Sequence, residues 1–211
     1  MKIDFVSDIS CPWCAIGLNA LEEAISRLGN AVAVELHFQP FELNPQMAAE
    51  GEEIVGHLSR KYGLTPEQCE QNAEMIRERG EAVGFTFGKG RRQRIYNTFD
   101  AHRLLHWAGL EGRQRALKRA LLSAYLTHGE NPNDPALLVR VAAEVGLDAA
   151  RAEAILASAD YAAEVRDRQA FYTGQGIHSV PSVIIDDRHL IQGGQPVEVF
   201  ERALRQLAQA A

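Results

Sequence analysis

Two cysteines separated by two residues stand between a strand pattern and a helix pattern, and this arrangement constrains the fold more than any other feature. Residues 2–6 are typical of a short buried strand, and residues 12–28 predict a helix that ends at Gly29 and Asn30. Residues 32–38 place apolar side chains at every second position, which predicts another strand. A strand, a helix and a strand in this order form a βαβ unit, whose two strands run parallel.

The middle of the chain is helical, and strand patterns return near its end. We expect about five helices between residues 44 and 158. Their N-cap residues are expected to be Thr65, Asn97, Asp134 and Asp148. Glycines that suit left-handed helix ends are Gly63, Gly84, Gly109, Gly129 and Gly146. Residues 182–186 and 189–192 predict a hairpin, and Pro196 opens a final helix. The expected class is therefore α/β, in the order βαβ, helical block, αββα.

Size and charge narrow the possible functions. A chain of 211 residues with 46% hydrophobic side chains can bury a full core. The net charge of −6 argues against nucleic acid as a partner, because a nucleic-acid binder normally presents a basic face. No apolar run approaches the roughly 20 residues that span a bilayer, and the N-terminus lacks the pattern of a secretory leader. We therefore expect a cytoplasmic protein with no membrane partner.

The chemistry of the chain is concentrated in the segment Cys11-Pro12-Trp13-Cys14. A redox disulfide needs two sulfurs within bonding reach, and two intervening residues on the first turn of a helix meet that requirement. Unpaired N–H groups at a helix N-terminus favour a thiolate, and in such motifs the thiol pKa falls from about 8.5 to roughly 3.5–7.5. The first cysteine, Cys11, is the expected nucleophile. Cys14, one turn further on, is placed to resolve a mixed disulfide.

A metal site built from the cysteines or histidines has less support in the sequence. A structural zinc site needs three or four ligands, and the remaining cysteine is Cys69. Cys69 falls on a helical apolar stripe and is expected to be a buried structural thiol. His102 and His106 are four residues apart and would share a helix face, but no third ligand is evident. We therefore expect no metal.

Four segments together resemble the FrnE-like branch of the DsbA family. They are CPWC at 11–14, FELNP at 41–45, NTFDAHRLL at 97–105 and GIHSVPS at 176–182. The resemblance implies a thioredoxin fold interrupted by an all-helical insertion. The thioredoxin-like domain would comprise residues 1–41 and 163–211, and the insertion residues 42–162.

The same resemblance assigns a role to Val180 and Pro181. In thioredoxin folds the proline that opens the third strand follows a cis peptide bond and faces the dithiol, where it presents no N–H group. Pro181 would then be part of the catalytic site, and the backbone of Val180 would pair with a substrate strand. Pro12 and Trp13, between the cysteines, are expected to contact the substrate as well.

These features predict a thiol–disulfide oxidoreductase or isomerase that acts on client proteins or peptides. It needs no cofactor beyond its own disulfide, with glutathione or a thioredoxin-type reductant as co-substrate, and it is a monomer or a homodimer. One alternative is a glutathione-dependent transferase or isomerase of the kappa or 2-hydroxychromene-2-carboxylate isomerase type, in which a serine occupies the position of Cys11. A second alternative is a non-catalytic, chaperone-like or metal-handling binder. The reduction direction and the physiological substrate stay open.

Overall fold

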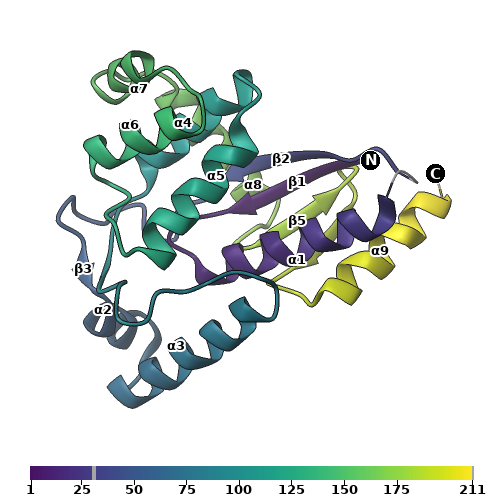
Figure 1. The fold of residues 1–211 in the computed structure, drawn as a ribbon, viewed down its shortest axis with the longest axis horizontal. Coiled ribbons are helices and arrows are strands. Elements are labelled where there is room, and N and C mark those ends of the chain that lie inside the picture. Colours follow the sequence, from purple (N-terminus) through teal and green to yellow (C-terminus); the bar gives the residue numbers. More distant parts are fainter. Residues whose placement is uncertain (30–31, 211) are drawn as a thin grey trace.

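The computed structural model describes residues 1–29 and 32–210, and a four-stranded sheet forms its centre (Figure 1). The strand order is β2-β1-β5-β6. The strands are β1 (Lys2–Ser7), β2 (Glu35–Pro40), β5 (Ser182–Ile185) and β6 (His189–Gln192). As predicted, β1 and β2 run parallel, while β5 pairs antiparallel with both β1 and β6. The sheet thus joins the two ends of the chain.

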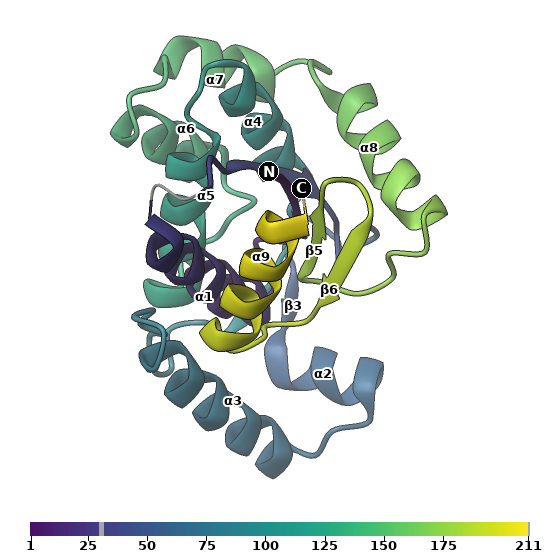
Figure 2. The ribbon, with the colours of Figure 1, turned by 90° about the vertical axis from the view of Figure 1, so that its right-hand side faces the viewer.

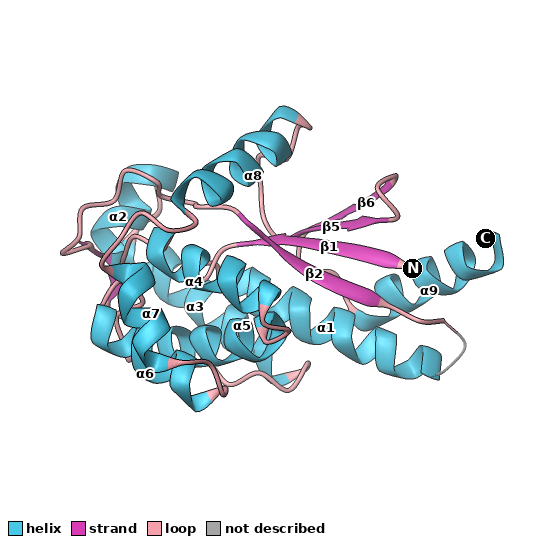
Figure 3. Ribbon diagram, turned by 90° about the horizontal axis from the view of Figure 1, so that it is seen from above, coloured by secondary structure: helices cyan, strands magenta, loops and turns pink. Residues whose placement is uncertain are grey.

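Helices cover both faces of this sheet, because successive side chains of a strand point to opposite faces. Ile3 and Phe5 of β1 belong to the main hydrophobic core, on the face covered by α1 (Pro12–Leu28) and α9 (Val197–Ala210). Val6 points the other way and packs with Tyr172 of α8 (Ala162–Gly174). Figures 2 and 3 show α1 beside α9 on one side of the sheet and α8 on the other. The mixed α/β class expected from the sequence is confirmed.

The segment between β2 and α8 is mainly helical. Its helices are α2 (Ile54–Tyr62), α3 (Pro66–Glu81), α4 (Phe99–Leu110), α5 (Gln114–Leu122), the π-helical turn η2 (Ser123–Thr127), α6 (Pro135–Glu144) and α7 (Ala149–Leu156). These are six α-helices where about five were expected. The segment is not entirely helical, because β3 (Glu52–Glu53) and β4 (Arg94–Ile95) form a short antiparallel ribbon. Within the described residues, no helix is both long and apolar enough to cross a membrane.

The helix starts follow the capping residues in the sequence. Thr65 and Gln68 form the reciprocal capping box of α3, and the carboxylates of Asp134 and Asp148 cap α6 and α7. Asn97 lies one residue outside the N-cap of α4, yet its side chain still accepts the Phe99 amide at 2.8 Å. Side-chain acceptors thus satisfy the free amides at four predicted helix starts.

Two boundaries differ from the sequence-based expectation. The second strand, predicted over 32–38, runs from Glu35 to Pro40, since its pairing with β1 begins opposite Lys2. Pro40 fits at its end because β2 is an edge strand. Gly109, expected at a helix end, lies inside α4, and Gly112 takes the left-handed conformation instead, with φ 68°. Gly29 ends α1 as predicted, with φ 58°, and Asn30 lies outside the described residues.

Candidate active site

The N-terminus of α1 holds the two cysteines of the CPWC segment. Cys11 is the N-cap residue of α1, with extended backbone angles, and Pro12 follows at the first helical position. The first turn contains no acidic side chain, and no side chain caps its free amides. The amide of Cys14 bonds to the carbonyl oxygen of Cys11 at 3.1 Å. The partial positive charge of the helix N-terminus therefore acts on the cysteines rather than on a carboxylate.

The surroundings shift the pKa values of the two thiols in opposite directions. Both are free thiols, with Cys14 fully buried and Cys11 4% exposed. Interaction with the Cys14 thiol lowers the pKa of Cys11 below its ordinary value, and the Cys14 amide and the charge of Arg92 act in the same direction. Burial, followed by the neighbouring Cys11, raises the pKa of Cys14 well above its ordinary value. This arrangement favours a Cys11 thiolate beside a protonated Cys14.

The loop before β5 lies against Cys11. The peptide bond between Val180 and Pro181 is cis, and the Cys11 thiol donates to the carbonyl oxygen of Val180 at 3.6 Å. Pro181 is buried against Gly17 of α1, where an added Cβ would lie only 3.0 Å from the proline Cγ. A side chain at residue 17 would therefore push the proline loop away from α1.

The two residues between the cysteines are partly exposed. Trp13 packs against the backbone at Gly194, where an added Cβ would lie 3.1 Å from the indole ring. Pro12 lines a mainly apolar groove with α2 and α3. Cys69 of α3 lines the same groove and is buried, as its helical stripe predicted. The structure thus brings Cys11, Cys14, Val180 and Pro181 together and leaves Pro12 and Trp13 at the surface beside them.

A buried carboxylate beneath the dithiol was not identified from the sequence. Asp8 is fully buried, and its oxygens accept 2.7 Å hydrogen bonds from the side chains of Ser10 and Thr98 and from the amide of Leu43. Burial alone would raise the pKa of Asp8. Interaction with His102, the Leu43 amide and Ser10 outweighs burial, and they hold the pKa well below its usual range. Asp8 therefore stays ionised and ties three chain segments together below Cys11.

Two cations near the dithiol were also missed. Arg92 is half-buried and donates to the carbonyl oxygen of Ser10 at 3.0 Å and to the Tyr125 hydroxyl at 2.8 Å. Lys118 of α5 is fully buried. Burial lowers the pKa of Lys118, whereas the charges of Cys14 and Asp8 act in the opposite direction. The sequence signal for Lys118 was its place within the apolar face of α5.

The two histidines of α4 occupy different surroundings. His102 is buried, and its Nε2 lies 3.4 Å from Asp8 Oδ1 without forming a hydrogen bond. His106 is partly buried and stacks on Tyr161, with ring centroids 5.2 Å apart. The two side chains therefore have separate partners.

Comparison with known proteins identifies the family of this chain. A family model described as the DSBA-like thioredoxin domain matches residues 2–205. The chain belongs to this family, whose members include disulfide oxidoreductases and related isomerases. The FrnE-like branch within it stays a prediction.

Individual relatives match along nearly the whole chain. The crystal structure of a probable DsbA oxidoreductase from Streptomyces coelicolor is 34% identical, with a TM-score of 0.91, over 100% of this chain and 90% of that one. The uncharacterized protein YwbO of Bacillus subtilis is 28% identical over 97% of this chain and 96% of its own length. The cytosolic disulfide reductase DsbM of Pseudomonas aeruginosa, in a structure with GSH, is 16% identical, with a TM-score of 0.69, and covers 99% and 100% of the two chains. The last likeness shows the fold alone.

Proposed function

We propose that this protein is a thiol–disulfide oxidoreductase or isomerase that acts on disulfides of proteins or peptides through Cys11 and Cys14. The observation that carries the proposal is the position of Cys11, which is the N-cap of α1, precedes the buried Cys14 by one turn and lies 3.6 Å from the Val180 carbonyl. The opposite shifts of the two thiol pKa values support it. A thiolate is the reactive form in disulfide exchange. A neighbouring thiol that stays protonated does not compete for the substrate and can later resolve the mixed disulfide.

The proposed reaction moves two electrons in two exchange steps. The Cys11 thiolate attacks one sulfur of the client disulfide, forms a mixed disulfide and releases the first client thiolate, which takes up a proton. Cys14 then loses its proton and attacks the Cys11 sulfur. This second step forms the Cys11–Cys14 disulfide and releases the second client thiol. The client is reduced and the enzyme oxidised, and the reverse sequence oxidises a client dithiol.

The proposed substrate contacts surround Cys11. Val180 and Pro181 form the wall next to the nucleophile, and the partly exposed Pro12 and Trp13 form the adjoining surface. An extended client segment would pair with the backbone of Val180. The proposal places the reaction in the cytoplasm and includes glutathione among the reductants to test, because the DsbM structure contains GSH. We also keep the division into residues 1–41 with 163–211 and an insertion at 42–162 as a proposal.

The test is a trapping experiment with three serine variants. Cys14→Ser should accumulate mixed disulfides with a peptide or insulin disulfide, because the resolving thiol is absent while the nucleophile remains. Cys11→Ser should accumulate none and lose reductase activity. Cys69→Ser is the matched control and should behave as wild type. Trapping by Cys11→Ser but not by Cys14→Ser would reverse the two roles.

A second assay separates this proposal from the transferase class. The wild-type protein should reduce the disulfide and should conjugate little glutathione to an electrophile such as 1-chloro-2,4-dinitrobenzene. Efficient conjugation that survives Cys14→Ser would overturn the oxidoreductase proposal.

A further inference from the structure

A cavity of about 450 Å³ lies along β2, an edge strand of the sheet. Its walls come from β2, α4, α5 and α8. The volume is within the range of small-molecule sites, which is about 300–1,000 Å³. Neither cysteine of the CPWC segment lines it, so the proposed disulfide chemistry does not account for it.

The ionisable side chains that line this cavity are all bases. They are His37, His102, His106, Arg115, Lys118 and Arg168. No carboxylate is among the described residues that line it. This one-sided lining is unusual in a chain whose net charge is −6. The cavity therefore presents two arginines and a lysine, together with three histidines that add positive charge only when protonated, and burial lowers the pKa of one of them, His106.

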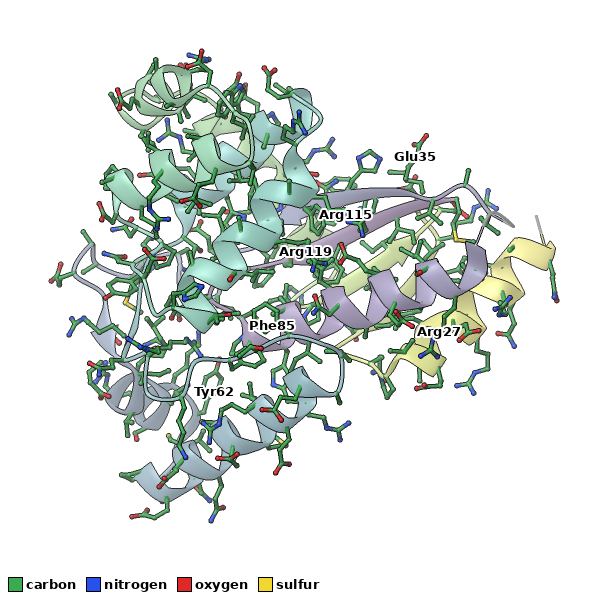
Figure 4. The ribbon with its side chains drawn as sticks, viewed as in Figure 1. Arg27, Glu35, Tyr62, Phe85, Arg115 and Arg119 are labelled. Atoms are coloured by element: carbon green, nitrogen blue, oxygen red, sulfur yellow. The ribbon has the colours of Figure 1, made fainter. Side chains whose placement is uncertain are left out.

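The carboxylates nearest to the cavity have other partners. Glu22 of α1 bonds to Arg115 at 2.6 Å and also to Arg119, so its single charge is shared by two arginines. Figure 4 shows both arginines extending from α5 toward α1. Asp8, near His102, already accepts hydrogen bonds from Ser10 and Thr98 and from a backbone amide. Those donors are neutral, so the charge of Asp8 still acts on His102 and Lys118, whereas Arg168 forms no ion pair among the described residues.

The cations are arranged by depth. Lys118 is fully buried, whereas Arg168 and Arg115, which line the same cavity, are exposed. His102 is also buried, and its Nε2 has no hydrogen-bond partner among the described residues. An anion that enters the cavity would give His102 an acceptor in addition to the Asp8 carboxylate, which lies 3.4 Å away.

Apolar side chains complete the lining. They include Leu36, Phe38 and Pro40 of β2 and Leu105 of α4. Such a wall suits a ligand that has a compact apolar body beside its charged group. The lining therefore favours an organic anion over a bare inorganic ion.

We propose that this cavity binds a small organic anion, with its carboxylate or phosphate group held by Lys118 and by the arginines at the rim. The inference is independent of the disulfide chemistry proposed above. Lysine binds such groups as a point charge, and arginine binds them through its planar fork of N–H donors. The apolar body of the ligand would lie against β2 and α4.

The experiment is a binding titration at low ionic strength, because salt screens the exposed arginines. The probes are benzoate, phenyl phosphate and the uncharged benzamide. We expect saturable binding of one anion per chain, detected by calorimetry and by shifts of the imidazole proton resonances of His102 and His106. His57, His128, His178 and His189 lie outside the cavity and serve as internal references. The tighter of the two anions identifies the preferred head group.

Two pairs of variants test the assigned residues. Lys118→Met should weaken anion binding about tenfold or more, and Lys89→Met, at an exposed loop lysine, should leave it unchanged. Arg168→Gln should weaken binding about threefold or more, whereas Arg202→Gln, on the exposed side of α9, should not. Absence of saturable binding, equal binding of benzamide, or equal affinity in Lys118→Met and wild type would each overturn the proposal.

Discussion

The thiol of Cys11 lies 3.6 Å from the carbonyl oxygen of Val180, a residue 169 positions later in the chain. A carbonyl oxygen can accept a hydrogen bond from a thiol but cannot donate one to a thiolate. When Cys11 loses its proton, this contact is lost and the thiolate depends on the helix N-terminus, Arg92 and Cys14. The Val180 carbonyl therefore favours the protonated thiol, whereas the groups that favour the Cys11 thiolate lie on α1 and at Arg92.

The first prediction concerns the order of thiol reactivity. In the reduced protein, iodoacetamide at about pH 6 should label Cys11 before Cys14 or Cys69, because the pKa of Cys11 is lowered and that of Cys14 is raised. Cys14→Ser should shift the alkylation profile of Cys11 to higher pH, since the Cys14 thiol contributes most to its acidity. Labelling can be followed by peptide mass spectrometry. Equal rates for Cys11 and Cys69 would contradict an activated nucleophile.

The second prediction concerns Asp8. Its folded pKa is depressed, so the stability it contributes is present above the unfolded value of about 3.9 and is lost as the pH falls through the folded value. Asp8→Asn should lower the free energy of unfolding at pH 7 by about 2 kcal/mol, because the amide cannot accept all of the carboxylate's hydrogen bonds. Urea unfolding from pH 7 to pH 3 should show the difference narrowing below about pH 4. A pH-independent difference would indicate a purely steric effect.

The same substitution has an effect on Cys11. The negative charge of Asp8 raises the pKa of Cys11, so its removal should lower that pKa further. Alkylation of Asp8→Asn should therefore reach its half-maximal rate at a lower pH than in wild type.

The third prediction concerns Lys118. Burial lowers its folded pKa, so holding it protonated costs stability below that pKa, and the cost disappears as the pH rises through the unfolded value of about 10.4. Lys118→Met should raise the free energy of unfolding at pH 7 by about 1 kcal/mol or more, with the gain shrinking toward pH 10. Lys89→Met, at an exposed position, should have little effect. A destabilised Lys118→Met would mean that the lysine charge is needed to balance Asp8.

The fourth prediction concerns the contact between α1 and the proline loop. Gly17→Ala should lower disulfide reductase activity and cost about 1 kcal/mol of stability, because the new Cβ meets Pro181 at 3.0 Å and Gly194 at 3.4 Å. Gly174→Ala in α8 is the matched control, since nothing lies within 4 Å of its added Cβ. That control should be neutral or stabilise by up to about 1 kcal/mol. Equal activity in both variants would show that the loop adjusts without consequence.

Local patterns in the sequence predicted most of the fold. The βαβ opening, the capping residues Thr65, Asp134 and Asp148, and the C-terminal hairpin all depend on neighbours within a few residues. The break between α4 and α5 was misplaced because Gly109 and Gly112 have equal freedom, and only packing decides which becomes left-handed.

The surroundings of the dithiol could not be predicted in the same way. Thr98 forms a hydrogen bond with Asp8, which is 90 residues away in the sequence, and Arg92 forms one with Ser10, which is 82 residues away. No local pattern relates such positions, because the neighbouring residues in the sequence do not distinguish a buried aspartate from an exposed one. The sequence does show Lys118 as a charged residue on an apolar helix face. Its position near Cys14, however, depends on how α5 packs.

The placement of Cys11 as the N-cap of α1 links protein stability to redox chemistry through a thermodynamic cycle. Stabilisation of the thiolate in the folded chain stabilises only the reduced protein, because the disulfide carries no charge for the helix to attract. At a pH above both the folded and the unfolded pKa of Cys11, each unit by which folding lowers that pKa adds about 1.4 kcal/mol to the stability of the reduced form. The same free energy makes the Cys11–Cys14 disulfide about 30 mV more oxidising. The lowered pKa of Cys11 therefore offsets, in the reduced protein, part of the stability that the disulfide supplies as a cross-link.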